Sequence, residues 1–161
     1  MRLWIYGIEL VVILIVGGFL ISRQKVLAPA PILSPAGLTV HQVRLGQAIV
    51  QAEVADTPAR RQKGLSGHAP LTQDQGMLFV FPAPARQSFW MIDMTFPLDM
   101  IWIGADKKVA GITANIPAPS PGTLPQDLPL YQSPEPAQYV LEVNAGWAEK
   151  QGIKLGDQAE W

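Results

Sequence analysis

The sequence contains no cysteine in its 161 residues, which excludes disulfide bonds, a thiolate metal site and a cysteine nucleophile. Its only histidines are His41 and His68, and no HExxH-like spacing is present, so we expect neither a metal site nor a cofactor. From residue 38 onward, nine Lys and Arg stand against twelve Asp and Glu without a basic run, which argues against a nucleic acid partner. Ser66 and Ser88 lack a nucleophile-elbow context, so a serine hydrolase has little support.

One long apolar run stands at the N-terminus, where Leu3 to Ile21 are interrupted by a single charge, Glu9. Nineteen helical residues span about 28 Å, which is close to the hydrocarbon thickness of a bilayer. We therefore predict that residues 1–22 form a transmembrane anchor. A cleaved signal peptide is the alternative, but the candidate cleavage motifs near Ala28 would place a proline directly after the cut.

The flanking charges leave the orientation of this segment open. Arg2 precedes it, and Arg23 and Lys25 follow it, so the positive-inside rule does not decide which end faces the cytoplasm. A short tail before a long domain most often stays in the cytoplasm, and we expect the domain on the other side of the membrane. Glu9 lies close enough to the end of the segment to reach the interface, and a contact with a partner helix is the alternative for this carboxylate.

Residues 23–37 are a predicted linker, because they contain three prolines and show no periodicity. The remaining residues, 38–161, suffice for one ordinary domain. We expect this domain to open with a hairpin, since Leu38–Leu45 and Ala48–Val54 alternate on either side of Gly46.

Two short helices are predicted from their capping residues. Thr57 can cap the first helix, Pro58 suits its first position, and Gly64 can end it. Asn144 is expected to cap the second helix, over Ala145–Gln151.

The most apolar part of the domain runs from Gly76 to Ile103, and proline, glycine and aspartate divide it into pieces too short for helices. We predict buried strands there and further strands later in the chain. A turn at Pro82–Arg86 and a kink at Pro97 should separate the first three strands. The predicted strands are Met77–Phe81, Gln87–Ile92, Met100–Ile103, Val109–Ala114, Gln138–Asn144 and a last one within Ile153–Trp161.

These elements predict a mainly β domain, a compact sandwich or barrel of seven or more short strands with two short helices. No strand-helix-strand alternation indicates a parallel sheet. Seven of the fifteen prolines lie between Ile116 and Pro136. We interpret this segment as a loop that covers a sheet edge, with a lid or binding loop as the alternative.

Five short sequence blocks form a recognisable pattern: Arg61-x-x-Gly64-Leu65, Gly76-Met77-Leu78-Phe79-x-Phe81, Phe89-Trp90-Met91-x-Asp93, Pro97-Leu98-Asp99 and Tyr139-Val140-Leu141-Glu142-Val143-x-Ala145-Gly146. In order and spacing, over residues 40 to 160, they resemble the DUF192 (UPF0127) family. The resemblance implies a compact, mainly β domain, frequent in exported or membrane-tethered bacterial proteins, whose biochemical activity is not established. With the predicted anchor, it favours a single-pass protein of the bacterial cytoplasmic membrane with a periplasmic domain. Asp93 stands where many relatives have Asn, and His68 where many have Arg.

Six polar residues are candidates for a ligand-binding site: Arg61, His68, Asp93, Asp99, Tyr131 and Glu142. Two of the carboxylates bracket the bend at Pro97 among tryptophans and methionines, where an unpaired charge is costly to bury. We expect counter-groups to converge on them. Arg61 either pairs with one of these aspartates as a structural ion pair or holds an anionic group of a ligand. The aromatic and methionine side chains nearby should be mainly core, with an apolar pocket as the alternative.

The sequence thus supports two hypotheses about function. The first is a non-catalytic, membrane-tethered, extracytoplasmic β domain that binds a small ligand or a protein partner at this polar corner. The second is a hydrolase-type enzyme that uses Asp93, Asp99 or Glu142 as acid and base. Catalysis requires Asp93 and Asp99 to face a cleft, whereas saturation of both carboxylates by Arg61 and backbone amides would oppose it.

Overall fold

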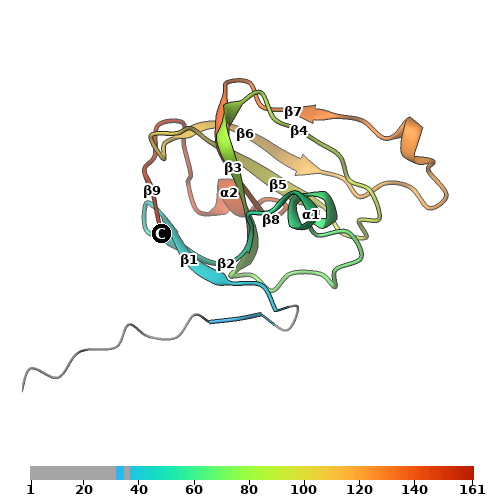
Figure 1. Cartoon of the computed structure of the whole chain (residues 1–161), viewed down its shortest axis with the longest axis horizontal. Coiled ribbons are helices and arrows are strands. Elements are labelled where there is room, and N and C mark those ends of the chain that lie inside the picture. The colour runs from blue at the N-terminus through green and yellow to red at the C-terminus, as the bar shows by residue number, and fades with distance from the viewer. Residues whose placement is uncertain (1–31, 35–36) are drawn as a thin grey trace, which may run out of the picture. The chain divides into compact units, whose positions relative to one another are not determined.

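The computed structural model describes residues 32–34 and 37–161, which Figure 1 shows in colour. The predicted anchor at residues 1–22 and most of the predicted linker at residues 23–37 lie outside the described residues. Within the described part, no helix is both long enough and apolar enough to cross a membrane. Residues 31–161 form one compact unit, which we call the domain.

The domain is mainly β, as predicted, and its described residues form nine strands, two short α-helices and one 3-10 helix. In chain order these are β1 (Val40–Leu45), β2 (Ala48–Ala55), α1 (Pro58–Lys63), β3 (Gln75–Ala85), β4 (Ser88–Phe89), β5 (Leu98–Ile103), β6 (Val109–Ile116), η1 (Pro125–Asp127), β7 (Tyr131–Gln132), β8 (Ala137–Asn144), α2 (Trp147–Lys150) and β9 (Ala159–Glu160).

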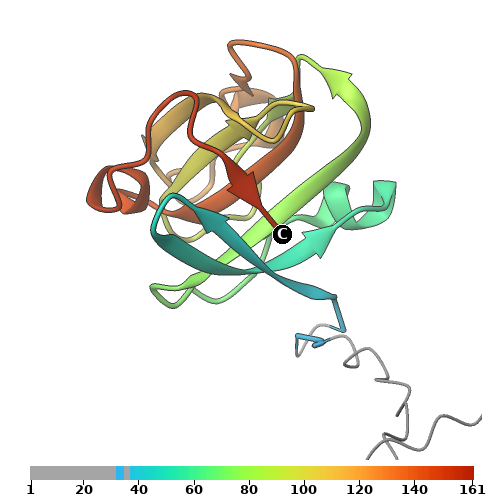
Figure 2. The ribbon, with the colours of Figure 1, turned by 90° about the vertical axis from the view of Figure 1, so that its left-hand side faces the viewer.

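Seven strands form one sheet in the order β6-β5-β8-β3-β2-β1-β9, and β4 pairs with β7 in a separate two-stranded ribbon. The predicted opening hairpin is confirmed, because β1 and β2 pair antiparallel around the turn at Gly46. The large sheet curls like part of a barrel (Figure 2). Its two edges meet at one point, where Lys108 beside β6 bridges Gln158 beside β9.

Two hydrophobic clusters bury both faces of the curled sheet. The first cluster joins residues from both edges, including Val109 and Ala159, and therefore fills the inside of the curl. The second cluster contains Phe79, Met100 and Trp102 and lies on the other face. β5 is buried at all six positions, which explains its nearly uninterrupted apolar sequence, because a strand covered on both faces needs no alternation.

β2 and β3 run parallel, which corrects the prediction that the sheet contains no parallel pair. α1 lies in the crossover between these two strands, and its predicted caps are confirmed. The side chain of Thr57 accepts a hydrogen bond from the amide of Arg60, Pro58 opens the helix, and the amide of Gly64 donates to the carbonyl of Arg60. A helix of six residues is too short to show a helical period, so the sequence does not reveal the crossover.

Several strands differ from their predicted bounds. β5 begins two residues earlier than predicted, at Leu98, and β6 ends two residues later, at Ile116. The largest differences are in β3 and β4. β3 continues to Ala85 through the prolines at which the sequence predicts a turn, and a shift in its register with β8 between Val80 and Ala85 accommodates them. β4 covers only Ser88–Phe89 instead of Gln87–Ile92. The residues that follow β4 leave the ribbon and cross the second cluster, where Met91 is buried.

Candidate functional site

Glu142 is a carboxyl group buried near the centre of the sheet. Its register partners are Met77 on β3 and Met100 on β5, the two strands that flank β8. Side chains opposite each other in register point to the same face of a sheet, so Glu142 projects into the second cluster, as do both methionines. The residue is only 4% exposed. Its carboxyl group makes no ion pair with any of the described residues.

Burial raises the pKa of Glu142 from its ordinary value of 4.5 to about 8, because the apolar surroundings disfavour the charged form. The carboxyl group is therefore mainly protonated at neutral pH. A protonated carboxyl has one O–H donor together with acceptor capacity on its carbonyl oxygen. Glu142 can accordingly offer a hydrogen bond without placing a full charge in the apolar cluster.

A pocket of about 340 Å³ opens above this carboxyl group, and we call it the Glu142 pocket. Its floor consists of sheet residues, Phe79, Phe81, Leu98 and Glu142 itself. Residues 61–66, at the end of α1, form one wall, and residues 88–92 with Met94 form the other. This volume falls at the lower end of the range typical of small-molecule sites, about 300 to 1,000 Å³, and the mainly apolar lining with a few polar groups is also typical of them.

Arg61 fixes the α1 wall against β3. Its Nη1 donates to the carbonyl oxygens of Asp56 at 2.7 Å and Val80 at 2.8 Å, and its guanidinium carbon lies 5.1 Å from the centroid of the Phe81 ring. These contacts use only one of the three guanidinium nitrogens. Lys63, an exposed residue, lines the same wall.

Two hydrogen bonds join the opposite walls of the pocket. The Ser66 hydroxyl donates to the carbonyl of Ile92 at 2.8 Å, and the amide of Gly67 donates to the carbonyl of Asp93 at 3.0 Å. Because both bonds connect the segment after α1 with the segment after β4, they hold the two walls at a fixed separation. Ser66 and Ile92 are site residues that the sequence alone does not indicate, since an isolated serine in a polar loop carries no signal.

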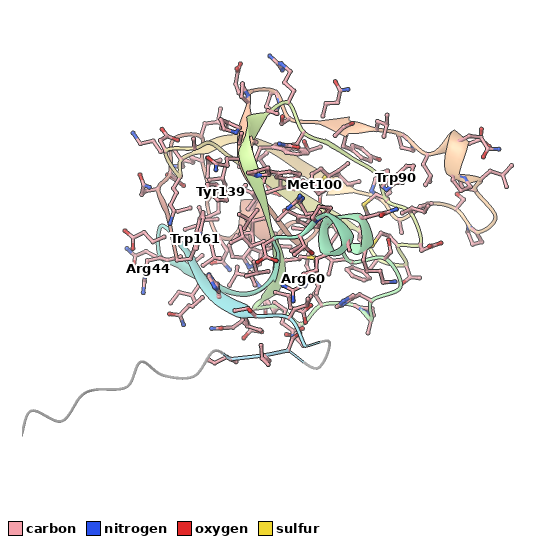
Figure 3. The ribbon with its side chains drawn as sticks, viewed as in Figure 1. Arg44, Arg60, Trp90, Met100, Tyr139 and Trp161 are labelled. Atoms are coloured by element: carbon pink, nitrogen blue, oxygen red, sulfur yellow. The ribbon has the colours of Figure 1, made fainter. Side chains whose placement is uncertain are left out.

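An aromatic cluster closes the side of the pocket formed by β4. The Phe89 ring packs edge-on against Phe79, with centroids 4.9 Å apart, and against Trp102, with centroids 5.6 Å apart. Trp90 is 46% exposed and lines the pocket. In Figure 3 it lies on the α1 side of the domain, whereas the Tyr139–Trp161 pair lies on the opposite side.

Asp99 lies apart from the Glu142 pocket and is saturated by the backbone. Its Oδ1 accepts hydrogen bonds from the amides of Asn115 at 2.8 Å and Gly146 at 3.0 Å, and its Oδ2 accepts one from Ala148 at 2.9 Å. The carboxylate therefore caps α2, in place of the predicted cap by Asn144. This is a structural role, because Asp99 is fully buried and lines none of the cavities described here.

Asp93 is exposed and adopts a positive φ of 54°, a conformation in which Asp and Asn are enriched among residues other than glycine. It borders a separate hollow of about 670 Å³, formed with the proline-rich segment 118–128. Arg61 forms no ion pair with Asp93 or Asp99 in the described residues. The predicted counter-groups thus converge on Asp99 alone, as backbone amides and not as Arg61. The three carboxyls of the acid and base hypothesis do not share one cavity.

The remaining two candidates, Tyr131 and His68, are also separated from Glu142. Tyr131 pairs with Phe89 across the β4–β7 ribbon and is half-buried. His68 lines a second cavity, where its Nε2 lies 3.9 Å from Oε2 of Glu53. This oxygen is buried and accepts no hydrogen bond from the described residues. The alternating sequence of β2 suggests that the Glu53 side chain faces solvent. In the fold, residues 68–71 lie beside it and line the same cavity.

Metal chemistry is not indicated by this arrangement. In residues 32–34 and 37–161, no three side chains of His, Asp or Glu lie close enough together to hold a metal ion. The Glu142 pocket combines a buried carboxyl, two cationic residues and aromatic walls, and we take it as the candidate site.

The fold and these sequence blocks define a family, and the chain belongs to it. Residues 40–161 match the DUF192 family, described as "Uncharacterized ACR, COG1430", which confirms the resemblance found in the sequence. No curated protein matches this chain.

Two solved structures are similar to this chain. The first is a protein of unknown function from Novosphingobium aromaticivorans, which is 34% identical with a TM-score of 0.72, over 87% of this chain and 99% of its own. The second, from Sinorhizobium meliloti, is described as a candidate transcription regulator and is 31% identical with a TM-score of 0.68. The match covers 76% of this chain and 94% of the Sinorhizobium chain. The matched region therefore makes up almost all of that solved chain.

Proposed function

We propose that the domain is a binding module that takes up a small, mainly apolar molecule in the Glu142 pocket, with the Glu142 carboxyl as the group that fixes its orientation. The observation that carries this proposal is a carboxyl group, buried and without an ion-pair partner in the described residues, at the floor of an open apolar pocket. The described residues make no side-chain hydrogen bond to the Glu142 carboxyl, which faces the pocket. A ligand that accepts the Glu142 O–H gains a directed hydrogen bond there, which gives the pocket specificity.

The arrangement of acidic groups favours binding over catalysis. A general acid and a general base have to act on the same substrate, yet Asp99 is engaged by three backbone amides and Asp93 borders a different hollow. Glu142 is the only carboxyl group among the described residues that line the pocket. A single protonated carboxyl suits a hydrogen bond to a ligand better than a two-step hydrolysis.

The binding of a neutral apolar dye, N-phenyl-1-naphthylamine, to the domain tests the proposal. The domain contains four methionines, Met77, Met91, Met94 and Met100, and all four belong to the second cluster. Methyl ¹³C spectra of methionine-labelled domain therefore report almost exclusively on this face. We expect the dye to fluoresce on binding and to shift the signals of Met91 and Met94, which line the pocket.

A pocket-blocking variant provides the matched comparison. Ser88→Trp places a large side chain on β4 at the pocket wall and should abolish both responses. Gln42→Trp makes the same addition on an exposed position of β1, away from the pocket, and should leave both unchanged. Equal dye binding by the two variants would refute the proposal.

A hydrolase acting through Glu142 is a second candidate, because burial holds the pKa of this carboxyl at about 8, within the range useful for a general acid. The hydrolase hypothesis predicts that the domain slowly hydrolyses p-nitrophenyl butyrate, and that Glu142→Gln loses this activity but still binds the dye. If the unmodified domain hydrolyses the ester no faster than the Ser88→Trp variant does, the hydrolase hypothesis is rejected.

We also propose that residues 1–22 hold the domain at the extracytoplasmic face of the bacterial cytoplasmic membrane. The support is the length and apolarity of this segment in the sequence. Full-length chain should sediment with membranes and be digested by protease added to spheroplasts, whereas the chain without residues 1–22 should remain soluble. Protection from protease in intact spheroplasts would reverse the proposed orientation.

A further inference from the structure

Two cationic side chains stand on one wall of the Glu142 pocket. Among the described residues, Arg61 and Lys63, both on α1, are the only cations that line it, and Glu142 is the only acidic residue. Arg60, the neighbouring cation, is already paired with Asp56 at 2.9 Å. Because Glu142 is mainly protonated at neutral pH, the pocket presents two positive charges on its wall and a neutral hydrogen-bond donor at its floor.

From this arrangement we infer that the ligand of the Glu142 pocket is an amphipathic anion. Its apolar body would occupy the space between the aromatic walls, and its negatively charged head group would lie against Arg61 and Lys63. The inference rests on the proposed function and names the chemical class of the ligand.

The guanidinium of Arg61 is prepared for such a head group. Its Nη1 donates one hydrogen bond to Val80 on β3 and one to Asp56 before α1, and none of the described residues accepts a hydrogen bond from Nε or Nη2. A guanidinium that is already fixed in place loses little side-chain freedom when it binds an anion. These two nitrogens can form the forked pair of hydrogen bonds with which arginine holds carboxylates. Lys63, exposed and flexible, adds a second, weaker attraction.

A cationic ligand fits the same site poorly. It would approach two like charges, and the neutral Glu142 would offer it no compensating negative charge. A neutral ligand would fill the apolar space but leave the donors of Arg61 without an acceptor. The three ligand classes can therefore be separated by a series of molecules that share one apolar chain.

The test uses octanoate, 1-octanol and octylammonium with the isolated domain, read out by the Met91 and Met94 methyl signals and by Trp90 fluorescence. We expect octanoate to bind at least about tenfold more tightly than octylammonium and several-fold more tightly than octanol, with a preference that weakens at high salt. Octanol or octylammonium binding as tightly as octanoate overturns the inference but leaves the proposed function standing. Failure of all three to shift the methyl signals refutes the proposed function itself.

Charge-neutralising variants assign the effect to particular residues. Lys63→Gln should lower octanoate affinity about twofold to fivefold, and Arg61→Gln about tenfold. Lys150→Gln, an exposed change on α2, is the control and should have no effect. Octanol binding reports whether each variant keeps its pocket, so loss of octanoate binding with octanol binding retained supports the inference. Unchanged octanoate affinity in both α1 variants contradicts it.

The protonation state of Glu142 gives a second readout. Since its pKa is about 8, octanoate binding should weaken about tenfold between about pH 6 and pH 9, as the carboxyl becomes negative. Glu142→Gln should remove this pH dependence, because no other carboxyl lines the pocket. Octanoate affinity that rises with pH would contradict the inference.

Discussion

Asp99 and Glu142 occupy adjacent strands, one residue apart in register, yet they lie on opposite faces of the sheet: Asp99 pairs with Val143, and Met100 pairs with Glu142. The alternation of β-strands thereby separates two buried carboxyl groups that are close together in the fold. Asp99 meets the backbone amides that begin α2, whereas Glu142 meets the apolar pocket. One carboxylate thus stabilises the domain, and the other is available to a ligand.

The first prediction concerns the pH dependence of stability. The pKa of Glu142 is about 8 in the folded domain and 4.5 in its ordinary state, so between these pH values the folded state binds a proton that the unfolded chain does not. The free energy of unfolding should therefore fall as pH rises through this window, by on the order of 5 kcal/mol. In Glu142→Gln this pH-dependent part of the free energy of unfolding should be absent. Urea unfolding at several pH values measures the difference between the two proteins.

Glu149→Gln is the matched control for this experiment, because Glu149 is exposed on α2. It should preserve the pH dependence of the unmodified domain. Identical pH profiles for the unmodified domain and Glu142→Gln would show that Glu142 titrates normally.

The second prediction concerns Asp99. Asp99→Asn replaces a carboxylate that accepts three backbone hydrogen bonds with an amide whose NH₂ group has to face one of those donors. We expect the free energy of unfolding to fall by about 2 to 4 kcal/mol. Asp106→Asn, at an exposed carboxylate that accepts one amide hydrogen bond from Lys108, should cost less than about 1 kcal/mol. Comparable losses in both variants would argue against a special role for Asp99.

The third prediction separates backbone conformation from ligand binding at Asp93. Because its φ is 54°, Asp93→Asn should change the free energy of unfolding by less than about 0.5 kcal/mol, whereas Asp93→Val should lower it by about 1 to 3 kcal/mol. Binding of N-phenyl-1-naphthylamine to Asp93→Asn should remain unchanged, since the side chain does not line the Glu142 pocket. A loss of dye binding in Asp93→Asn would restore this residue to the candidate site.

The fourth prediction tests the close approach of strands beneath the site. A Cβ atom at Gly76 would lie 2.7 Å from the carbonyl oxygen of Glu142 and 2.9 Å from Cγ1 of Val50. Gly76→Ala should therefore displace β3 from β8 and lower the free energy of unfolding by about 1 to 3 kcal/mol. The Met77 methyl signal should shift as well. A fully stable Gly76→Ala domain with an unchanged Met77 signal would mean that the strands are further apart.

Local chemistry made much of the fold predictable. The alternation of residues 38–54 around Gly46 predicts the β1–β2 hairpin, and Thr57, Pro58 and Gly64 predict α1, because turns and helix ends depend on residues only a few positions apart. The alternation of β8 likewise assigns Leu141 and Glu142 to opposite faces. These features require no knowledge of distant partners.

The sequence by itself determined the family, the mainly β class and the presence of Glu142 among the candidate residues. Only the tertiary structure decided which candidates share a site: it assigned Asp99 to α2, separated Asp93 and His68 from Arg61, and placed Arg61 on the wall of the pocket whose floor contains Glu142. The physical reason is that desolvation and hydrogen-bond saturation depend on what packs over a side chain. In this domain those neighbours come from segments dozens of residues away, across a parallel crossover that has no local signature.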